Sequence, residues 1–427
     1  MSEQCRALIL ERIRQHGPLT FAEFMDLALY HPQVGYYASA TRRSGRTGDF
    51  YTSVDVAPLF GELLAEQFAE MGRVMIASSE VRSPKVRSQT SDVGRRTPGD
   101  DAAISAVAQG FSPATLDLVE AGAGDGRLSR DVLDALEPIA PDLYARVQLH
   151  LVERSAAARQ VQRETLGRHA SKLASSTTDL PSPIHGIVFA NELLDALPTH
   201  AVVAREGGLH EIFIDALDDQ LIERELPAST PAIEERLARL EVRLRSGWRA
   251  EVNLRAIEWM REAARALRHG FLVLADYGHE ANVLYSASHA QGTLATFTGH
   301  VVETRGNGRA APWLRDPGGS DITAHVDFTS IRQAAEAEGL DAVCIVDQMH
   351  FLMGLGIESK LRESRGSQRE DVTRRLALKT LLIPGGLGTS HHVMIFGKNV
   401  GRPALRGCSR SRWTAARRVL GAAEPRD

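Results

Sequence analysis

The chain has 427 residues and a formal net charge of −4, with hydrophobic and charged shares of 43% and 24%. This composition is typical of a globular protein, and the length allows a core domain together with a second lobe or large insertions. The weakly acidic balance excludes the basic footprint that most nucleic-acid-binding domains carry, so we expect no nucleic-acid partner.

The cysteines and the start of the chain bear on metal binding and on the compartment. Cys5, Cys344 and Cys408 lie far apart and show no metal-ligand spacing, so we expect a reducing compartment and no metal site. Residues 1–16 lack the apolar core of a signal peptide. No stretch approaches the roughly 20 apolar residues that span a bilayer. The expected location is cytoplasmic, and the sequence indicates no oligomeric state.

Near the N-terminus, Thr20 and Glu23 have the spacing of a capping box at the start of a helix. Two loops that combine aromatic residues with glycine follow, at residues 29–37 and 48–53. Because loops generally run on the surface and often carry function, aromatic loops here favour a binding role. Packing of their rings onto the core is the alternative.

Composition divides the chain into four predicted parts. Residues 1–72 form an N-terminal lobe, and residues 73–113 are rich in Ser, Arg, Gly, Asp and Pro, which predicts a flexible insertion. Residues 114–400 form the main domain, with an inserted hairpin and helices. The arginine-rich residues 401–427 are predicted to be a disordered basic tail.

The main domain begins with an apolar strand that ends at Glu120, a turn with glycines at 122, 124 and 126, and an amphipathic helix from Leu128. Glycine permits positive φ and close approach of a ligand, and a helix N-terminus attracts anionic groups. The phosphate-loop pattern is absent, and the third glycine comes one position too early for the dinucleotide fingerprint. An ordinary tight loop between strand and helix is the alternative.

Strands and helices alternate over the rest of the domain, as in α/β folds. Strand 147–152 ends at Glu153, and strand 186–190 ends at Asn191. Further elements are expected at 155–166 (a helix capped by Ser155), 201–214 (a hairpin), 232–244 and 250–267 (helices), 271–278 (a strand), 321–338 (a helix with Asp327 as cap), and 342–346 and 392–396 (strands).

The pattern Glu-x-Gly-x-Gly-x-Gly, from Glu120 to Gly126, resembles the first motif of class I S-adenosylmethionine (SAM) methyltransferases. Further motifs resemble the MidA family of these enzymes, which includes the mitochondrial arginine methyltransferase that assists assembly of respiratory complex I. They are Tyr-His-Pro-x-x-Gly-Tyr-Tyr from Tyr30, Gly-Asp-Phe-x-Thr from Gly48, Pro-x-Phe-Gly from Pro58, Asn-Glu-Leu-Leu-Asp-Ala-Leu-Pro from Asn191, Asp-Tyr-Gly from Asp276 and Asp-Ile-Thr-Ala-His-Val-Asp-Phe from Asp321.

The resemblance implies an α/β fold, a Rossmann-like class I methyltransferase sheet with helices on both faces, together with an N-terminal helical and loop lobe and inserted segments. It also implies SAM as the cofactor. The residues that it assigns to cofactor binding are Gly48, Asp49, Glu120, Gly122, Gly124, Gly126, Glu153 and Asn191.

Glu192 and Asp195 are the candidate catalytic residues, because two carboxylates would fix the planar guanidinium of an arginine and help it to lose a proton. The alternative is that Asp195 caps the following turn and Glu192 makes a structural contact. The resemblance favours a protein acceptor, and a small-molecule acceptor stays open. DNA adenine methylation is disfavoured, because no Pro-Pro-aromatic segment follows Asn191.

The sequence therefore predicts a SAM-dependent methyltransferase that methylates an arginine of a protein partner. One rival is a nicotinamide-dependent oxidoreductase, against which the glycine spacing speaks. The other rival is a non-catalytic, SAM-binding assembly factor with the same fold.

Overall fold

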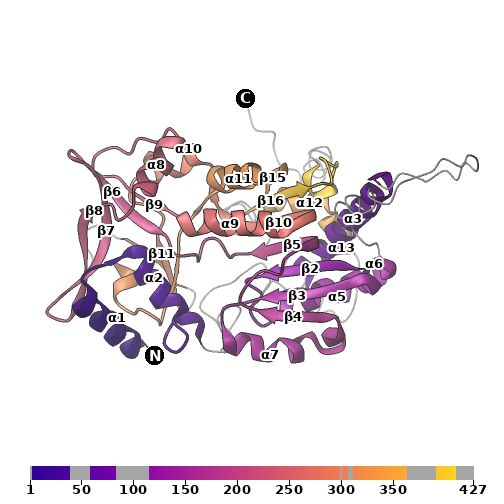
Figure 1. Ribbon diagram of the computed structural model, residues 1–427, viewed down its shortest axis with the longest axis horizontal. Coiled ribbons are helices and arrows are strands. Elements are labelled where there is room, and N and C mark those ends of the chain that lie inside the picture. The colour runs from indigo at the N-terminus through magenta and orange to yellow at the C-terminus, as the bar shows by residue number, and fades with distance from the viewer. Residues whose placement is uncertain are drawn as a thin grey trace, which may run out of the picture.

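Strand β2 (Leu116–Ala121) lies in the main sheet between β5 (Ile184–Asn191) and β3 (Val147–Val152). Figure 1 shows how the elements are arranged. The structure is a computed structural model, and it describes residues 2–38, 58–82, 115–298, 301–305, 311–362 and 391–409.

The main sheet has the order β15-β16-β10-β5-β2-β3-β4, with β14 beside the end of β10. Strands β10, β5, β2, β3 and β4 run parallel, whereas β16 is antiparallel to both of its neighbours. The parallel strands end at one edge, so the residues that follow them meet there. The further strands of this sheet are β4 (Leu173–Thr177), β10 (Leu267–His279), β14 (Val326–Asp327), β15 (Asp341–Asp347) and β16 (His391–Lys398).

Helices cover both faces of this sheet (Figure 1), which confirms the predicted fold class. Alternate residues of β2 point to opposite sides, as the period of a strand requires. Leu116 and Leu118 belong to the core beneath α3 and α5, while Val119 and Ala121 belong to the core beneath α9 and α11. These helices are α3 (Leu59–Arg82), α5 (Arg127–Ile139), α9 (Leu254–Ala266) and α11 (Phe328–Ala337).

Helix α3 approaches α5 closely at Gly61. A Cβ at that position would lie 2.7 Å from the Cβ of Asp131, a distance that real Cβ atoms do not reach. Glycine at this position is therefore required by the packing of the two helices. This accounts for the glycine of the motif that starts at Pro58.

The N-terminal helices α1 (Ser2–His16) and α2 (Phe21–Tyr30) pack on a second, antiparallel sheet of order β1-β7-β6-β9, seen at the left of Figure 1. β8 pairs with β7, and a third sheet has the order β12-β11-β13. The strands of these two sheets are β1 (Leu19–Thr20), β6 (His200–Arg205), β7 (Gly208–Leu217), β8 (Gln220–Pro227), β9 (Arg249–Val252), β11 (Ala295–Thr298), β12 (Val301–Thr304) and β13 (Asp321–Thr323).

The described residues contain further helices. They are α6 (Pro141–Arg146), α7 (Ala156–Leu166), α8 (Pro231–Arg239), α10 (Ala281–Leu284), α12 (Gln348–Gly354) and α13 (Ile357–Arg362), with 3-10 turns η1 (Tyr36–Ala38), η3 (Gly167–Lys172), η4 (Ala287–His289), η5 (Pro312–Leu314) and η6 (Arg406–Cys408).

The three predicted helix caps are present. Thr20 accepts a hydrogen bond from the N–H of Glu23, whose carboxylate accepts from the N–H of Thr20, so the capping box is complete. Ser155 caps α7, and Asp327 caps α11 by accepting from the N–H of Ser330 at 3.1 Å. Short-range side-chain chemistry determined these helix starts.

Two predicted helices are shorter than expected. The helix expected at 232–244 ends at Arg239, and the one expected at 250–267 begins at Leu254, after strand β9. The segment expected to open a helix at Asp321 instead forms β13, which pairs with β11. Pairing with a neighbouring strand outweighed local helical preference at residues 249–252 and 321–323.

The predicted boundaries of the insertion and of the N-terminal lobe also need correction. Residues 73–82 continue α3 rather than starting a flexible insertion, because Met75 is fully buried in the core beneath that helix. Residues 59–72 belong to the same core, whereas residues 2–38 pack on the second sheet.

Residues 401–409, predicted as part of a disordered tail, pack on the main domain. Leu405 is buried, and the guanidinium of Arg406 lies 3.1 Å from the carboxylate of Glu66 on α3. Cys408 forms a disulfide with Cys344 of β15, their Cα atoms 5.9 Å apart. A disulfide does not agree with the expected reducing compartment. The spacing of Cys344 and Cys408 in the sequence did not indicate this disulfide, which depends on how the folded segment packs against β15.

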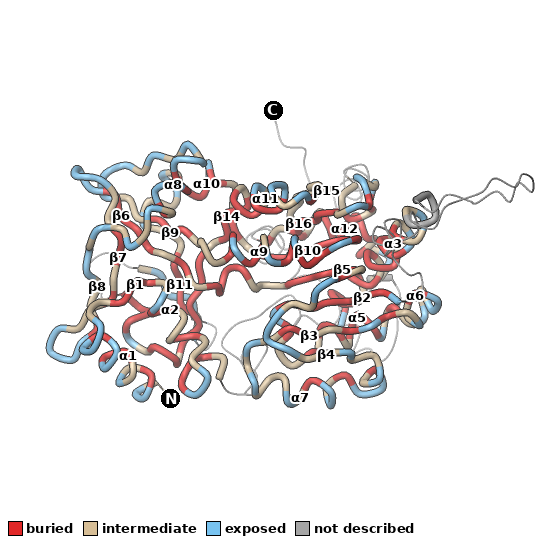
Figure 2. The backbone as a smooth tube through the Cα atoms, in the orientation of Figure 1, coloured by how far each residue is buried: buried red, intermediate tan, exposed pale blue. Residues whose placement is uncertain are grey.

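Buried residues concentrate along the strands of both large sheets, as Figure 2 shows. Within the described ranges, none of the helices combines the length and the apolar character that a membrane crossing needs.

We expect Phe189→Ala to lower the free energy of unfolding by about 3–5 kcal/mol, because removal of a large core ring leaves a cavity. Phe189 is 2% exposed, and its ring centroid lies 5.1 Å from that of Phe68 on α3. Urea unfolding followed by circular dichroism measures the change. Val302→Ala, at a side chain that is 55% exposed, is the control and should shift the midpoint little. Equal midpoints for the two variants would contradict the packing described for β5.

Candidate active site

The loop between β2 and α5 places three glycines in the left-handed region, with φ of 71° at Gly122, 51° at Gly124 and 85° at Gly126. Other residues rarely adopt this backbone, so the loop depends on glycine. A Cβ would meet Leu193 at Gly122 and Leu151 at Gly126, at 3.1 and 3.2 Å. At Gly124 no atom of the described residues lies within 4 Å, so this position faces open space.

Glu120 and Glu153 lie on the same face of the sheet. Glu120 is in register with Leu151, and Glu153 comes two residues later, on the side of α5. Glu153 accepts hydrogen bonds from the N–H groups of Gly124, at 2.9 Å, and Ser155, at 2.7 Å. A carboxylate has about four acceptor positions, so Glu153 keeps capacity for a ligand.

The carboxylate of Glu120 faces the first turn of α5. It accepts from the N–H of Ser129 at 3.2 Å and from the hydroxyl of the same residue. Burial raises the pKa of Glu120 to about 8. A positively charged group next to it would favour the ionised form.

The segment that follows β5 is held by hydrogen bonds from several elements. One oxygen of Asp276, at the end of β10, accepts from the N–H groups of Leu193 and Leu194, at 3.2 and 2.8 Å. The side-chain amide of Asn253, which caps α9, donates to the carbonyls of Leu194 and Leu197. The backbone of this segment is therefore fixed before any ligand binds.

Asp195 presents a buried carboxylate from this segment. Its carbonyl accepts from the N–H of Ala324 at 3.0 Å, and its carboxylate accepts from the Tyr277 hydroxyl and the Ala196 N–H. The Oδ1 atom is buried and has no hydrogen-bond partner among the described residues. Burial, together with the nearby charge of Glu192, raises the pKa of Asp195 to about 7. An unsatisfied buried oxygen of this kind is costly and suggests a ligand.

Glu192, three residues before Asp195, has a backbone conformation that is unusual for a residue other than glycine, with φ of 51°. Its Oε1 accepts from the side-chain amide of Asn191 at 3.2 Å and lies 3.5 Å from Nε2 of His391. The Oδ1 atom of Asn191 is buried and unpartnered within the part of the chain that the structure describes. Left-handed backbone at residues other than glycine costs about 1–3 kcal/mol and clusters at functional sites.

The N-terminal aromatic motif reaches the same edge of the sheet. The Tyr37 hydroxyl donates to Asp321 at 2.9 Å, and the Tyr30 ring stacks on Tyr37 with centroids 5.4 Å apart. The Tyr30 hydroxyl donates to the carbonyl of Ala196, and the guanidinium of Arg154 lies over the Tyr30 ring. These tyrosines thus connect the N-terminal lobe to the segment after β5 and to the start of β13.

The structure brings most of the predicted site residues to one edge of the main sheet. They are Glu120, Gly122, Gly124, Gly126, Glu153, Asn191, Glu192 and Asp195. Gly48 and Asp49 lie outside the described residues. His391, the first residue of β16, was not among the predicted site residues, but its ring faces Glu192. No local sequence signal could have indicated this contact, because β16 follows β15 in the chain and yet lies beside β10.

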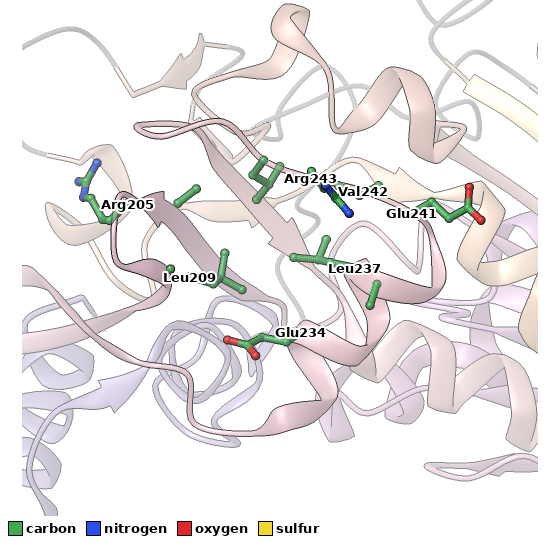
Figure 3. Close-up of a pocket in the computed structure, with 11 residues that line it drawn as sticks. Arg205, Leu209, Glu234, Leu237, Glu241, Val242 and Arg243 are labelled. Atoms are coloured by element: carbon green, nitrogen blue, oxygen red, sulfur yellow. The ribbon is translucent and has the colours of Figure 1, made fainter.

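A separate hollow of about 820 Å³ lies between the β6–β7 turn and α8 (Figure 3). Apolar side chains such as Leu209, Leu237 and Val242 line it, with Arg205 and Glu234 at its margin. None of the strand-end acids is among its lining residues, so this hollow is not part of the candidate active site.

The fold and the site together define a class I SAM-dependent methyltransferase: a mainly parallel sheet, a glycine loop after β2, and acidic residues at the ends of β2 and β3. The family described as "Putative S-adenosyl-L-methionine-dependent methyltransferase" matches residues 103–346, and the chain belongs to this family.

Curated relatives extend over most of the chain. The chain is 27% identical over 384 residues to the mitochondrial protein arginine methyltransferase NDUFAF7 of Mus musculus. This match covers 83% of the chain and 74% of that protein. The chain is 28% identical over 403 residues to the Drosophila melanogaster homolog, with 85% and 76% covered. Both relatives are named as mitochondrial proteins, which contradicts the predicted cytoplasmic location.

A solved structure from Burkholderia thailandensis, bound to S-adenosyl-homocysteine, superposes with a TM-score of 0.78 at 27% identity, covering 96% of this chain and 95% of that one. SAM is the cofactor of this class of enzyme. The described residues fit it, because Gly124 leaves open space, Asn191 offers an unpartnered buried oxygen, and Glu120 would gain from a nearby ammonium group. The assignment of each residue to a part of the cofactor stays a prediction.

We expect Glu153→Gln to weaken binding of S-adenosyl-homocysteine by about 10- to 100-fold, because a hydrogen bond to a charged group contributes about 1.5–3 kcal/mol. Isothermal titration calorimetry measures the affinity, and circular dichroism checks the fold. Glu164→Gln, an exposed position on α7, is the matched control. If both variants bind like the unmodified chain, Glu153 does not hold the cofactor.

Proposed function

We propose that the chain transfers the methyl group of SAM to a guanidinium nitrogen of an arginine in a protein partner. The names of the relatives support the acceptor class, since both are protein arginine methyltransferases. The observation that carries the proposal for this chain is the buried Asp195 carboxylate, with its unpartnered Oδ1 and its pKa raised to about 7.

The chemistry of the acceptor explains why such a carboxylate is useful. A guanidinium has a pKa above about 12 and remains protonated in proteins, so it must lose a proton as it is alkylated. A general base works best when its pKa lies near the operating pH, and burial brings Asp195 into that range. Asp195 is therefore the residue that accepts the proton.

Glu192 supplies the second carboxylate of the pair. It follows β5 directly, with its backbone in the left-handed region. Two acidic groups on one fixed segment can accept hydrogen bonds from two edges of a planar guanidinium, which orients one nitrogen. Asn191 holds the Glu192 carboxylate by its side-chain amide.

SAM, when bound, supplies a methyl group on a sulfonium sulfur, which is already a good electrophile. The arginine nitrogen forms a bond to the methyl carbon as the carbon–sulfur bond breaks, and the N–H proton passes to Asp195. The protein mainly has to align the two reactants, which explains the many hydrogen bonds that fix residues 191–197.

The acceptor is identified by incubating the purified chain and methyl-tritiated SAM with lysate from a strain that lacks its gene. Acid hydrolysis of the labelled protein, followed by chromatography against methylarginine and methyllysine standards, assigns the modified residue. We expect label in methylarginine. Label in methyllysine or in a small molecule would overturn the acceptor class, and no label above a boiled control would favour the non-catalytic rival.

We expect Asp195→Asn to reduce the initial rate of label incorporation by at least about 100-fold, the usual contribution of a general base. Affinity for S-adenosyl-homocysteine should change little, because Asp195 acts on the acceptor. Asp218→Asn is the control, in an exposed turn whose positive φ suits asparagine. A rate equal to that of the control would return Asp195 to a structural role.

The rate at low acceptor concentration should rise with pH through an inflection near 7, where the Asp195 carboxyl loses its proton. The raised pKa means that the base is protonated, and inactive, over a wider acidic range than an ordinary aspartate. The residual activity of Asp195→Asn should lack this inflection. An inflection that persists in the variant would assign it to another group.

A further inference from the structure

Three histidines meet beside the candidate active site and have no part in the proposed reaction. They are His279 at the end of β10, His289 at the end of η4, and His325 between β13 and β14. One ring nitrogen from each lies within 4.8 Å of the others. Three separate segments of the chain thus deliver imidazoles to one point.

The ring of His289 is oriented by hydrogen bonds. Its Nδ1 lies 3.0 Å from the carbonyl of Val283, and a carbonyl can only accept, so Nδ1 carries the proton. In the neutral ring, Nε2 is then the atom with the free lone pair. A histidine ligand whose other nitrogen donates to a backbone carbonyl is the usual arrangement around protein-bound metals.

His325 offers a second indication of a ligand. Its Nδ1 is buried and has no hydrogen-bond partner among the described residues. Its backbone N–H donates to the hydroxyl of Thr293, which in turn donates to Glu251, so the segment is held in place independently of the ring. A buried nitrogen with a lone pair and no donor is expensive unless something binds it.

The electrostatic surroundings favour neutral imidazoles. Burial, followed by the charges of His279, His289 and His391, lowers the pKa of His325 to about 4, and burial likewise lowers the pKa of His279. The neighbours that act on His325 are thus themselves histidines. Neutral imidazole is the form that coordinates zinc and similar ions.

We propose that His279, His289 and His325 form a binding site for a divalent transition-metal ion such as zinc. Three histidines with a fourth position open to water are a common zinc donor set. Ligand nitrogens in a tetrahedral site lie roughly 3.3 Å apart, given zinc–nitrogen bonds of about 2.0–2.1 Å, so the rings would move together slightly on binding.

The ion would join the end of β10 to the β13–β14 turn directly behind the active site. The ring of His325 packs edge-on against Tyr277, with centroids 5.8 Å apart, and Tyr277 donates to Asp195. Metal binding would therefore fix the position of Tyr277, without itself taking part in methyl transfer.

The test uses the full chain without a histidine tag, stripped with a chelator and then titrated with zinc chloride by calorimetry. Cobalt chloride gives a second readout, because tetrahedral cobalt has a strong visible absorption. We expect one zinc ion per chain. Loss of one of three ligands, in His289→Ala or His279→Ala, should weaken zinc binding by at least about 100-fold, more than loss of an outer-shell partner does.

His16→Ala, at the exposed end of α1, removes a histidine elsewhere and should bind zinc like the unmodified chain. Circular dichroism and affinity for S-adenosyl-homocysteine check that the variants are folded. If His279→Ala does not fold, the zinc affinity of His289→Ala alone decides the test. The proposal is overturned if the unmodified chain takes up no zinc, or if a folded ligand variant binds zinc as tightly as His16→Ala.

Discussion

The hydrogen bonds of Asp276 hold together the edge of the main sheet that carries the candidate active site. One carboxylate oxygen accepts from two consecutive N–H groups of the segment after β5, and the other accepts from the N–H of Tyr277. The side chain is 1% exposed, so these bonds are shielded from water. These bonds tie the end of β10 to the segment that follows β5. They thereby set the positions of Glu192 and Asp195 relative to Tyr277, whose hydroxyl donates to Asp195.

Around this connection, two units of the chain contribute residues to the candidate site. The main sheet supplies the glycine loop and the acids at the ends of β2, β3 and β5, all at one edge because the strands are parallel. The N-terminal lobe, together with the inserted sheet, supplies Tyr30 and Tyr37, which reach that edge through hydrogen bonds to Ala196 and Asp321.

Much of the geometry of the candidate site could be predicted from the sequence, because the signals for it are local. The strand ending at Glu120, the spacing of three glycines and the helix from Leu128 fall within a few residues, and each has a direct physical meaning. The capping residues Thr20, Ser155 and Asp327 could equally be predicted from the sequence, because a cap accepts a hydrogen bond from an N–H only two or three positions away.

What the sequence by itself determined is therefore the class of fold, the glycine loop after β2 and the acids that end the parallel strands. Only the tertiary structure decided the contact of His391 with Glu192, the disulfide between Cys344 and Cys408, and the meeting of His279, His289 and His325. The physical reason is the same in each case. These contacts join segments that are distant in the chain, and their proximity depends on strand order and loop packing, which leave no pattern at any fixed spacing in the sequence.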